Sequence, residues 1–231
     1  MFALENLKIV RERVVTACQR VGRDPSEVTL VGVTKTVSPH DMVAAYEHGL
    51  KSFGENRVQE AIPKIEALAQ KGLAPRWHLI GHLQTNKAKR AAELFDVIQS
   101  VDSVRLAEIL QRHAEACGRM LEIFVQVNTS GEGTKSGVAP QEALQLIRDL
   151  AGFSHVRVTG LMTIGALDPD SAKTRLCFRL LRELGETVAA HHIANVSMRH
   201  LSMGMTDDFE IAIAEGSTMI RVGRALFGER P

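Results

Sequence analysis

The chain lacks several features that would indicate a secreted or nucleic-acid-binding protein. Its 231 residues include only three cysteines, and its net charge is +1. A sparse and odd set of cysteines is typical of buried thiols in a reducing compartment and excludes a disulfide framework. The near-zero net charge provides no electrostatic basis for binding nucleic acid or an anionic membrane surface. We therefore expect a cytoplasmic protein that binds neither.

Long hydrophobic runs are also absent. No stretch approaches the ~18 consecutive apolar residues of a membrane span. Residues 1–8 carry charges where a signal peptide needs an apolar run. No linker, repeat or low-complexity segment divides the chain. Because 45% of the residues are hydrophobic, we expect residues 1–231 to form a single domain with a sizeable core.

The chain does contain a regular alternation of short strand-like runs and longer segments of helical period. A first helix is predicted over 4–21, where apolar residues recur at steps of three and four. Strands are then predicted, with helices between them, at 28–34, 51–54, 77–80, 95–101, 121–127, 157–163, 196–201 and 217–222. Ser38 with Pro39 is predicted to begin the helix after the first strand, and Asp102 to cap the helix that begins at Val104.

Eight β-α units in about 230 residues fit a (β/α)8 barrel, with the first helix as an extra element of the outer ring. An open, doubly wound sheet is the alternative. The barrel is favoured because the strand count is eight and no Gly-x-Gly-x-x-Gly turn follows the first strand. The predicted fold class is therefore α/β, a TIM barrel with an added N-terminal helix.

The carboxyl ends of the strands in such a barrel meet on one face, where active sites lie. Lys35 follows the first strand, where a lysine is either a surface charge or a nucleophile for a carbonyl group. The loops after the seventh and eighth strands contain Gly204 and Gly223, and glycine allows the backbone to approach a phosphate closely. Ser202 adds a hydroxyl donor, and Arg221 adds a cation. These residues predict a site for a phosphorylated ligand.

Simpler explanations exist for parts of this set. Arg221 could pair with an acid such as Glu215, and the glycines could be ordinary turn residues. His78 and His82 have the i, i+4 spacing of a zinc site. However, Leu79 replaces the glutamate of the helical zinc motif, and the two histidines fall on a predicted strand and its loop. We therefore expect no metal site.

Six short motifs occur along the chain, at residues 33–36 (VTKT), 53–57 (FGENR), 78–84 (HLIGHLQ), 160–163 (GLMT), 201–205 (LSMGM) and 221–228 (RVGRALFG). In this order they resemble the YggS/PROSC family of pyridoxal phosphate homeostasis proteins. The resemblance extends from about residue 5 to residue 230. It implies the barrel of the alanine racemase N-terminal domain and the cofactor pyridoxal 5′-phosphate (PLP).

The resemblance also implies how this cofactor would be held. Lys35 would carry PLP as a Schiff base, Asn56 would lie beside the ring, and Arg221 would face the pyridine nitrogen. Arginine does not give up its proton, so it keeps the ring nitrogen unprotonated and weakens the cofactor as an electron sink.

The phosphate of PLP would be bound by the two glycine-containing loops. By resemblance, Ser202, Gly223 and Arg224 would bind it, the last two chiefly through backbone N–H groups. Met203 and Gly204 would line the same loop.

The function implied is that of a carrier, and no catalytic residue is assigned. Alanine racemase needs a second base, a tyrosine from a separate C-terminal domain, whereas the only tyrosine here, Tyr46, is predicted in the helix after the first strand. The implied role is to hold PLP reversibly, to keep free PLP low and to supply PLP-dependent apoenzymes, with effects on amino-acid pools. One alternative is a slow PLP-dependent amino-acid racemase. Another is a Schiff-base aldolase that acts on a sugar phosphate.

Two further features concern transfer and assembly. Lys135 could be a transient second acceptor of the aldehyde. A barrel without the second domain of alanine racemase lacks part of the surface through which that family forms dimers, so we expect a monomer.

Overall fold

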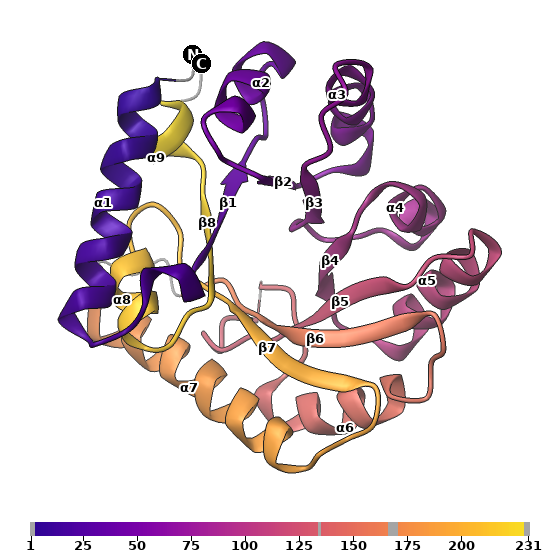
Figure 1. The fold of residues 1–231 in the computed structure, drawn as a ribbon. Coiled ribbons are helices and arrows are strands. Elements are labelled where there is room, and N and C mark those ends of the chain that lie inside the picture. The colour runs from indigo at the N-terminus through magenta and orange to yellow at the C-terminus, as the bar shows by residue number, and fades with distance from the viewer. Residues whose placement is uncertain (1–2, 134, 166–170, 229–231) are drawn as a thin grey trace.

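The computed structural model describes residues 3–133, 135–165 and 171–228. Its strands form a closed barrel in which each strand is parallel to the next and β8 returns to pair with β1 (Figure 1). The strands are β1 (Thr29–Val33), β2 (Ser52–Glu55), β3 (Arg76–Leu79), β4 (Val97–Val101), β5 (Leu121–Gln126), β6 (Val156–Met162), β7 (Val196–Ser202) and β8 (Met219–Val222). The predicted barrel is confirmed, and the open doubly wound sheet is wrong.

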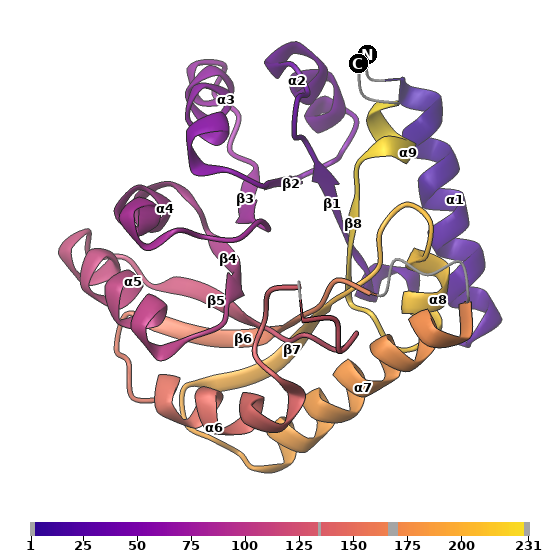
Figure 2. The same cartoon turned by 180° about the vertical axis from the view of Figure 1, so that it is seen from behind.

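Helices surround the barrel and connect successive strands. They are α1 (Leu4–Arg20), α2 (Pro39–Glu47), α3 (Val58–Gln70), α4 (Ala88–Leu94), α5 (Val104–Ala116), α6 (Pro140–Leu150), α7 (Ser171–Ala190), α8 (Phe209–Ala214) and α9 (Arg224–Phe227), with 3-10 turns η1 (Pro25–Glu27) and η2 (Thr85–Lys87). The extra helix α1 is confirmed, and it lies in the outer ring beside α8 and α9 (Figures 1 and 2). Among the described residues, every helix is too short or too polar to span a bilayer.

The helix starts follow local capping chemistry. The Ser38 hydroxyl accepts a hydrogen bond from the backbone N–H of Asp41 at 3.2 Å, and Pro39 occupies the first turn of α2, as predicted. The predicted cap at Asp102 is wrong. Ser103 caps α5 instead, because its hydroxyl lies three residues before the N–H of Leu106 that it accepts.

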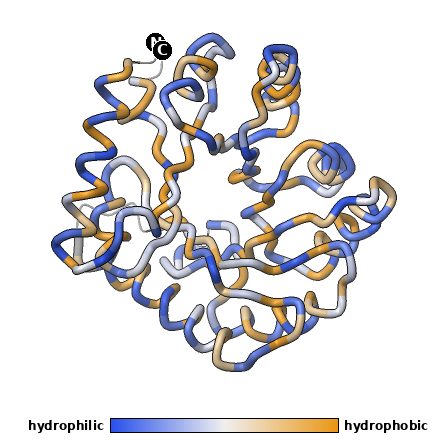
Figure 3. The backbone as a smooth tube through the Cα atoms, in the orientation of Figure 1, coloured by the Kyte–Doolittle hydropathy of each residue, from blue (hydrophilic) through white to orange (hydrophobic). Residues whose placement is uncertain are grey.

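Apolar side chains form two cores. The larger lies between the barrel and its helices, and the alternation of apolar and polar residues along each helix in Figure 3 is typical of helices with one buried face. The smaller fills the barrel with side chains from five strands, namely Val31, Val97, Phe124, Met162 and Met219. Each fully buried side chain of this size contributes ~1.5–3 kcal/mol to stability, so burial of the two cores is a large favourable term in the folding of the barrel.

The cysteines form no disulfide among the described residues. Cys18 and Cys177 are buried, as the sequence predicts, whereas Cys117 is exposed at the end of α5. The expectation of a buried thiol is therefore wrong for Cys117, because it directly follows the last residue of α5 and faces solvent.

Candidate functional site

Lys35 lies in the turn between β1 and α2, at the carboxyl end of the barrel. It is half-buried and lines a cleft of about 660 Å³ together with Asn56, the second residue predicted near the cofactor ring. Arg57, His82 and Lys87 also line this cleft. The cleft therefore combines a primary amine and a carboxamide with the cations of Arg57 and Lys87 and with one carboxylate, that of Glu60, which lies 3.5 Å from Arg57.

The backbone on either side of Lys35 is constrained. Thr34 is buried, and its N–H donates to the carbonyl of Gly54 on the neighbouring strand at 3.0 Å. Thr36 has a φ of 65°, in the left-handed region that a β-branched residue rarely adopts. Strain of this kind persists only where the surrounding structure enforces it, and it is concentrated at functional sites.

A second cavity, of about 320 Å³, lies where β1 meets β8. It is lined by Val33, Met205, Thr206, Asp207, Arg221, Gly223 and Arg224. The structure thus brings together three predicted residues, Arg221, Gly223 and Arg224. Val33 lies two residues before Lys35, so this cavity adjoins the lysine turn.

Gly204 joins the two loops beside this cavity. Its carbonyl accepts a hydrogen bond from the backbone N–H of Arg221 at 3.0 Å. Its φ is 93°, and a Cβ at this position would lie 2.6 Å from Cβ of Ala212. Only glycine fits here, for both reasons.

Arg221 is a buried cation held by neutral groups. Its Nη1 donates to the Ser202 hydroxyl at 2.7 Å, and its Nη2 donates to the carbonyl of Thr163 at 2.8 Å. Burial lowers the pKa of Arg221 to about 10, and the negative charge of Asp208 opposes that shift. No ion pair links Arg221 to a carboxylate within the described residues.

The alternative pairing of Arg221 with Glu215 is wrong. Glu215 instead contacts three arginines of α7, namely Arg175 at 2.7 Å, Arg179 at 3.3 Å and Arg182 at 3.9 Å. Arg221 therefore has no partner at Glu215, and it lines the cavity together with a second arginine, Arg224.

Ser202 is fully buried, and its hydroxyl is already engaged. It accepts from Arg221 and donates to Oε1 of Gln99 at 2.6 Å. Nε2 of Gln99 in turn lies 3.0 Å from Nδ1 of His78. Ser202 therefore belongs to a hydrogen-bond chain that crosses the barrel and holds Arg221, and it does not line the cavity. Met203 is also fully buried.

Thr206 is the hydroxyl residue that does line this cavity, and sequence reasoning missed it. Its Oγ1 lies 3.4 Å from the backbone N–H of Ala225, which follows Gly223 and Arg224. The sequence does contain a signal for Thr206, since it is the next hydroxyl residue after Ser202 in the segment that follows β7. The sequence did not show which of the two residues points outward.

The side chain of Arg224 contacts a carboxylate, so we do not expect it to bind the phosphate. Its Nη2 lies 2.6 Å from both carboxylate oxygens of Asp207. A contribution of Arg224 to ligand binding would therefore come from its backbone, as the resemblance implies.

His78 and His82 have different environments, as predicted from the strand and the loop. His78 is buried on β3, and burial lowers its pKa to about 3, with further lowering from Arg76 and His200. His82 is exposed in the following loop. In the chain as far as it is described, no group of three His, Cys, Asp or Glu side chains could hold a metal ion.

The remaining predicted residues lie apart from both cavities. Lys135, in the loop after β5, donates to Oε1 of Glu132 at 2.7 Å and to the carbonyl of Gly165 at 3.0 Å. Tyr46 is half-buried on α2, with Nζ of Lys51 3.5 Å from its ring centroid.

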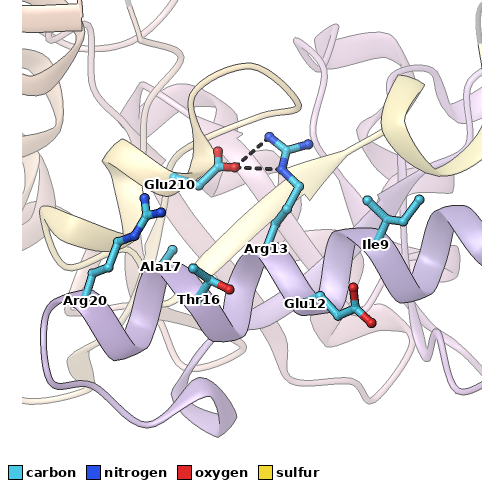
Figure 4. A pocket seen from close by; sticks show the side chains of 7 residues that line it. All are labelled: Ile9, Glu12, Arg13, Thr16, Ala17, Arg20 and Glu210. Carbon is cyan, nitrogen blue, oxygen red and sulfur yellow. Dashed lines mark hydrogen bonds and ion pairs between the residues drawn. The ribbon is translucent and has the colours of Figure 1, made fainter.

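A further pocket, of about 300 Å³, lies on the outer surface between α1 and α8 (Figure 4). Arg13 points across it toward Glu210, and their side chains meet at 2.7 Å. None of the predicted ligand-binding residues lines this pocket.

The family model of the alanine racemase N-terminal domain matches residues 6–231. A pyridoxal phosphate homeostasis protein of Aquifex aeolicus is 43% identical over 230 residues, which cover 100% of this chain and 99% of the relative. The chain belongs to the pyridoxal phosphate homeostasis protein family.

Solved structures agree with this membership. PipY of Synechococcus elongatus, solved with PLP bound, is 38% identical and superposes with a TM-score of 0.81, covering 95% of this chain and 100% of that chain. Alanine racemase of Corynebacterium glutamicum is 19% identical with a TM-score of 0.72, covering 100% of this chain and 63% of that chain. The racemase likeness shows the shared barrel fold alone.

Proposed function

We propose that this member of the family binds PLP reversibly, buffers its free concentration and supplies it to PLP-dependent apoenzymes. The observation that carries the proposal is the placement of the Lys35 turn next to a cavity that is lined by Arg221, Gly223 and Arg224. β1 and β8 pair directly, so the turn that bears Lys35 adjoins the cavity of Arg221 and Gly223. PipY, which has PLP bound, supports the choice of ligand.

The residues present fit this cofactor. When bound, PLP supplies an aldehyde. The Lys35 amine would form a Schiff base with it and release water, and hydrolysis would free the aldehyde again. Arg221 is a buried donor without a carboxylate partner in the described chain, and such a group fits a ring nitrogen that stays unprotonated. Asn56 lines the same cleft as Lys35, as a neighbour of the ring would.

The phosphate fits the cavity beside β8. Backbone N–H groups of Gly223 and Arg224, with Gly204 fixing the adjacent loop, offer neutral donors to an anion. We assign the hydroxyl donor to Thr206, because it lines the cavity. Ser202 then serves as the residue that holds Arg221.

A carrier role is favoured over racemisation by the position of Tyr46. A racemase needs a second base across the cofactor from the lysine, and Tyr46 lies on α2, where it lines neither cavity. The match of residues 6–231 to the family model of the alanine racemase N-terminal domain is the observation that keeps slow racemisation as the second candidate. Exchange of the α-proton of an amino acid in deuterated water, lost in Lys35→Ala, would favour that candidate.

The test is direct attachment of the cofactor. The protein should remain yellow after it is mixed with PLP and the unbound PLP is removed by dialysis, and borohydride should fix the mass of the cofactor onto the peptide that contains Lys35. Lys35→Ala should abolish the colour and retain weaker binding through the phosphate, whereas Lys89→Ala, at an exposed position of α4, should behave as the wild type. Failure of the wild type to bind PLP would refute the proposal, and a colourless protein that reacts with sugar phosphates would favour the aldolase.

A further inference from the structure

A buried ion pair lies directly under the Lys35 turn. Glu55, the last residue of β2, is fully buried, and Lys64 of α3 is 8% exposed. Nζ of Lys64 lies 2.7 Å from Oε1 of Glu55. Removing both charges from water costs free energy that their attraction repays poorly, so a buried pair is weak evidence for stability alone. Its location suggests another role.

Both members of the pair hold Thr34, the residue before Lys35. Nζ of Lys64 donates to the carbonyl of Thr34 at 2.6 Å, and the Thr34 hydroxyl donates to Oε1 of Glu55 at 2.5 Å. The carbonyl of Thr34 belongs to the peptide group whose nitrogen is that of Lys35. Because a peptide group is planar, fixing this carbonyl also fixes the direction in which the chain enters Lys35.

The residues that follow Lys35 form a strained turn, which also depends on the Thr34 carbonyl. The N–H of Val37 donates to the same Thr34 carbonyl at 2.9 Å and closes a turn over Lys35 and Thr36. Thr36 has a φ of 65°, which is unfavourable for threonine. The Thr34 carbonyl is thus the shared acceptor of the turn and of Lys64, and the ion pair helps to hold a strained turn in one conformation.

The Glu55 carboxylate is not fully satisfied by these contacts. Oε2 is buried and has no hydrogen-bond partner in the described part of the chain. An unpaired buried oxygen is destabilising, so the site keeps a carboxylate at a cost in stability. The carboxylate offsets this cost by holding the Lys64 ammonium against the Thr34 carbonyl.

We propose that Glu55 and Lys64 are positioning residues, which act through Thr34 to aim the Lys35 amine at the aldehyde of the ligand. The inference rests on the proposed function, because it assumes that Lys35 reacts with PLP. The pair itself contacts the turn and not the ligand. Its effect is therefore on the covalent step and not on the binding of the phosphate.

The experiment compares two ligands on the same variants. Pyridoxal phosphate reports attachment to Lys35 through the rate at which the absorption band of the Schiff base replaces that of the free aldehyde, here called colour formation. Pyridoxine 5′-phosphate carries an alcohol in place of the aldehyde, so its dissociation constant reports the non-covalent site alone. Glu55→Gln and Thr34→Val should slow colour formation by about a hundredfold, the size expected for a misplaced reacting group, and leave the affinity for pyridoxine 5′-phosphate unchanged.

Two controls separate positioning from general stability. Thr34→Ser retains the hydroxyl and should restore most of the rate. Glu215→Gln removes a carboxylate that is also buried and paired, but with the arginines of α7, and should leave both measurements unchanged. Thr34→Val keeps the ion pair, so it remains informative if Glu55→Gln fails to fold.

Two results would overturn the inference. Equal losses of colour formation and of pyridoxine 5′-phosphate binding would show that the pair only supports the cleft. An unchanged rate in both Glu55→Gln and Thr34→Val would show that the pair does not act through the turn, because the first variant removes the charge that anchors Lys64 and the second removes the Thr34 hydroxyl contact. If the wild type forms no colour but binds pyridoxine 5′-phosphate, the proposed attachment of PLP to Lys35 is wrong. This result differs from a failure of the positioning role, in which the wild type forms colour and the variants form it equally fast.

Discussion

Lowering the pH should decrease the free energy of unfolding of this protein through one buried imidazole, that of His78. The side chain is fully buried on β3, and its Nε2 has no hydrogen-bond partner among the described residues. Burial, with Arg76 and His200, lowers its pKa to about 3. A histidine in the unfolded chain has a pKa of ~6.5. As the pH falls below that value, the unfolded state therefore takes up a proton that the folded state excludes.

The sign and size of the effect follow from this difference. The stability that neutral His78 contributes is complete above about pH 6.5 and is lost progressively as the pH falls toward 3. Between about pH 7.5 and about pH 5, the unfolded imidazole becomes almost fully protonated and the folded one remains neutral. One pKa unit corresponds to ~1.4 kcal/mol, so the loss over this interval is about 2 kcal/mol for this residue.

Urea unfolding at the two pH values tests this reasoning in the wild type and in His78→Gln. Glutamine removes the titration but retains a side chain that can hydrogen-bond to Gln99. The free energy of unfolding of His78→Gln should fall by about 2 kcal/mol less than that of the wild type. The pKa of His200 is also lowered by burial, but His200 is present in both proteins, so its effect cancels.

His40→Gln, at an exposed position of α2, is the control and should behave as the wild type. If His78→Gln loses as much stability on acidification as the wild type, His78 is not the group responsible, and the inference of a neutral buried imidazole is wrong.

Other predictions concern the cavity at β8. Gly204→Ala should lower the free energy of unfolding by about 1–3 kcal/mol, measured by thermal denaturation, because the added Cβ meets Ala212 at a positive φ. Thr206→Val should weaken PLP binding in equilibrium dialysis about fivefold, the value of one hydrogen bond, and Ser202→Ala should weaken it less; the reverse order would contradict the assignment of the phosphate hydroxyl. Arg221→Glu should shift the absorption of bound PLP by allowing the ring nitrogen to be protonated, and an unchanged spectrum would place Arg221 elsewhere.

The sequence was sufficient for the barrel because the evidence for it is local. A run such as Ile123–Val125 is apolar at consecutive positions, and this pattern marks a strand buried on both faces wherever it occurs in the chain. The cap at Ser38 was predicted for the same reason, since its partner lies three residues away. The miss at Asp102 shows the limit, because neighbouring capping residues differ by one position that only the helix start decides.

The candidate site was predicted in part. Lys35, Asn56, Arg221, Gly223 and Arg224 all line cavities at the carboxyl ends of the strands. Sequence position alone could not show that the hydroxyl of Ser202 is buried while that of Thr206 faces the cavity. It also could not show that Glu215 is occupied by arginines of α7.

The order and type of the elements, the lysine turn and the glycine loops could all be read from local sequence, because each depends on residues close together in the chain. The partners of the buried charges depend instead on how the strands come together. Arg221 meets Thr163 across 58 residues, and Lys64 meets Thr34 across 30. Closure of the barrel brings such pairs together, and no local pattern specifies which donor faces which acceptor once the strands have met.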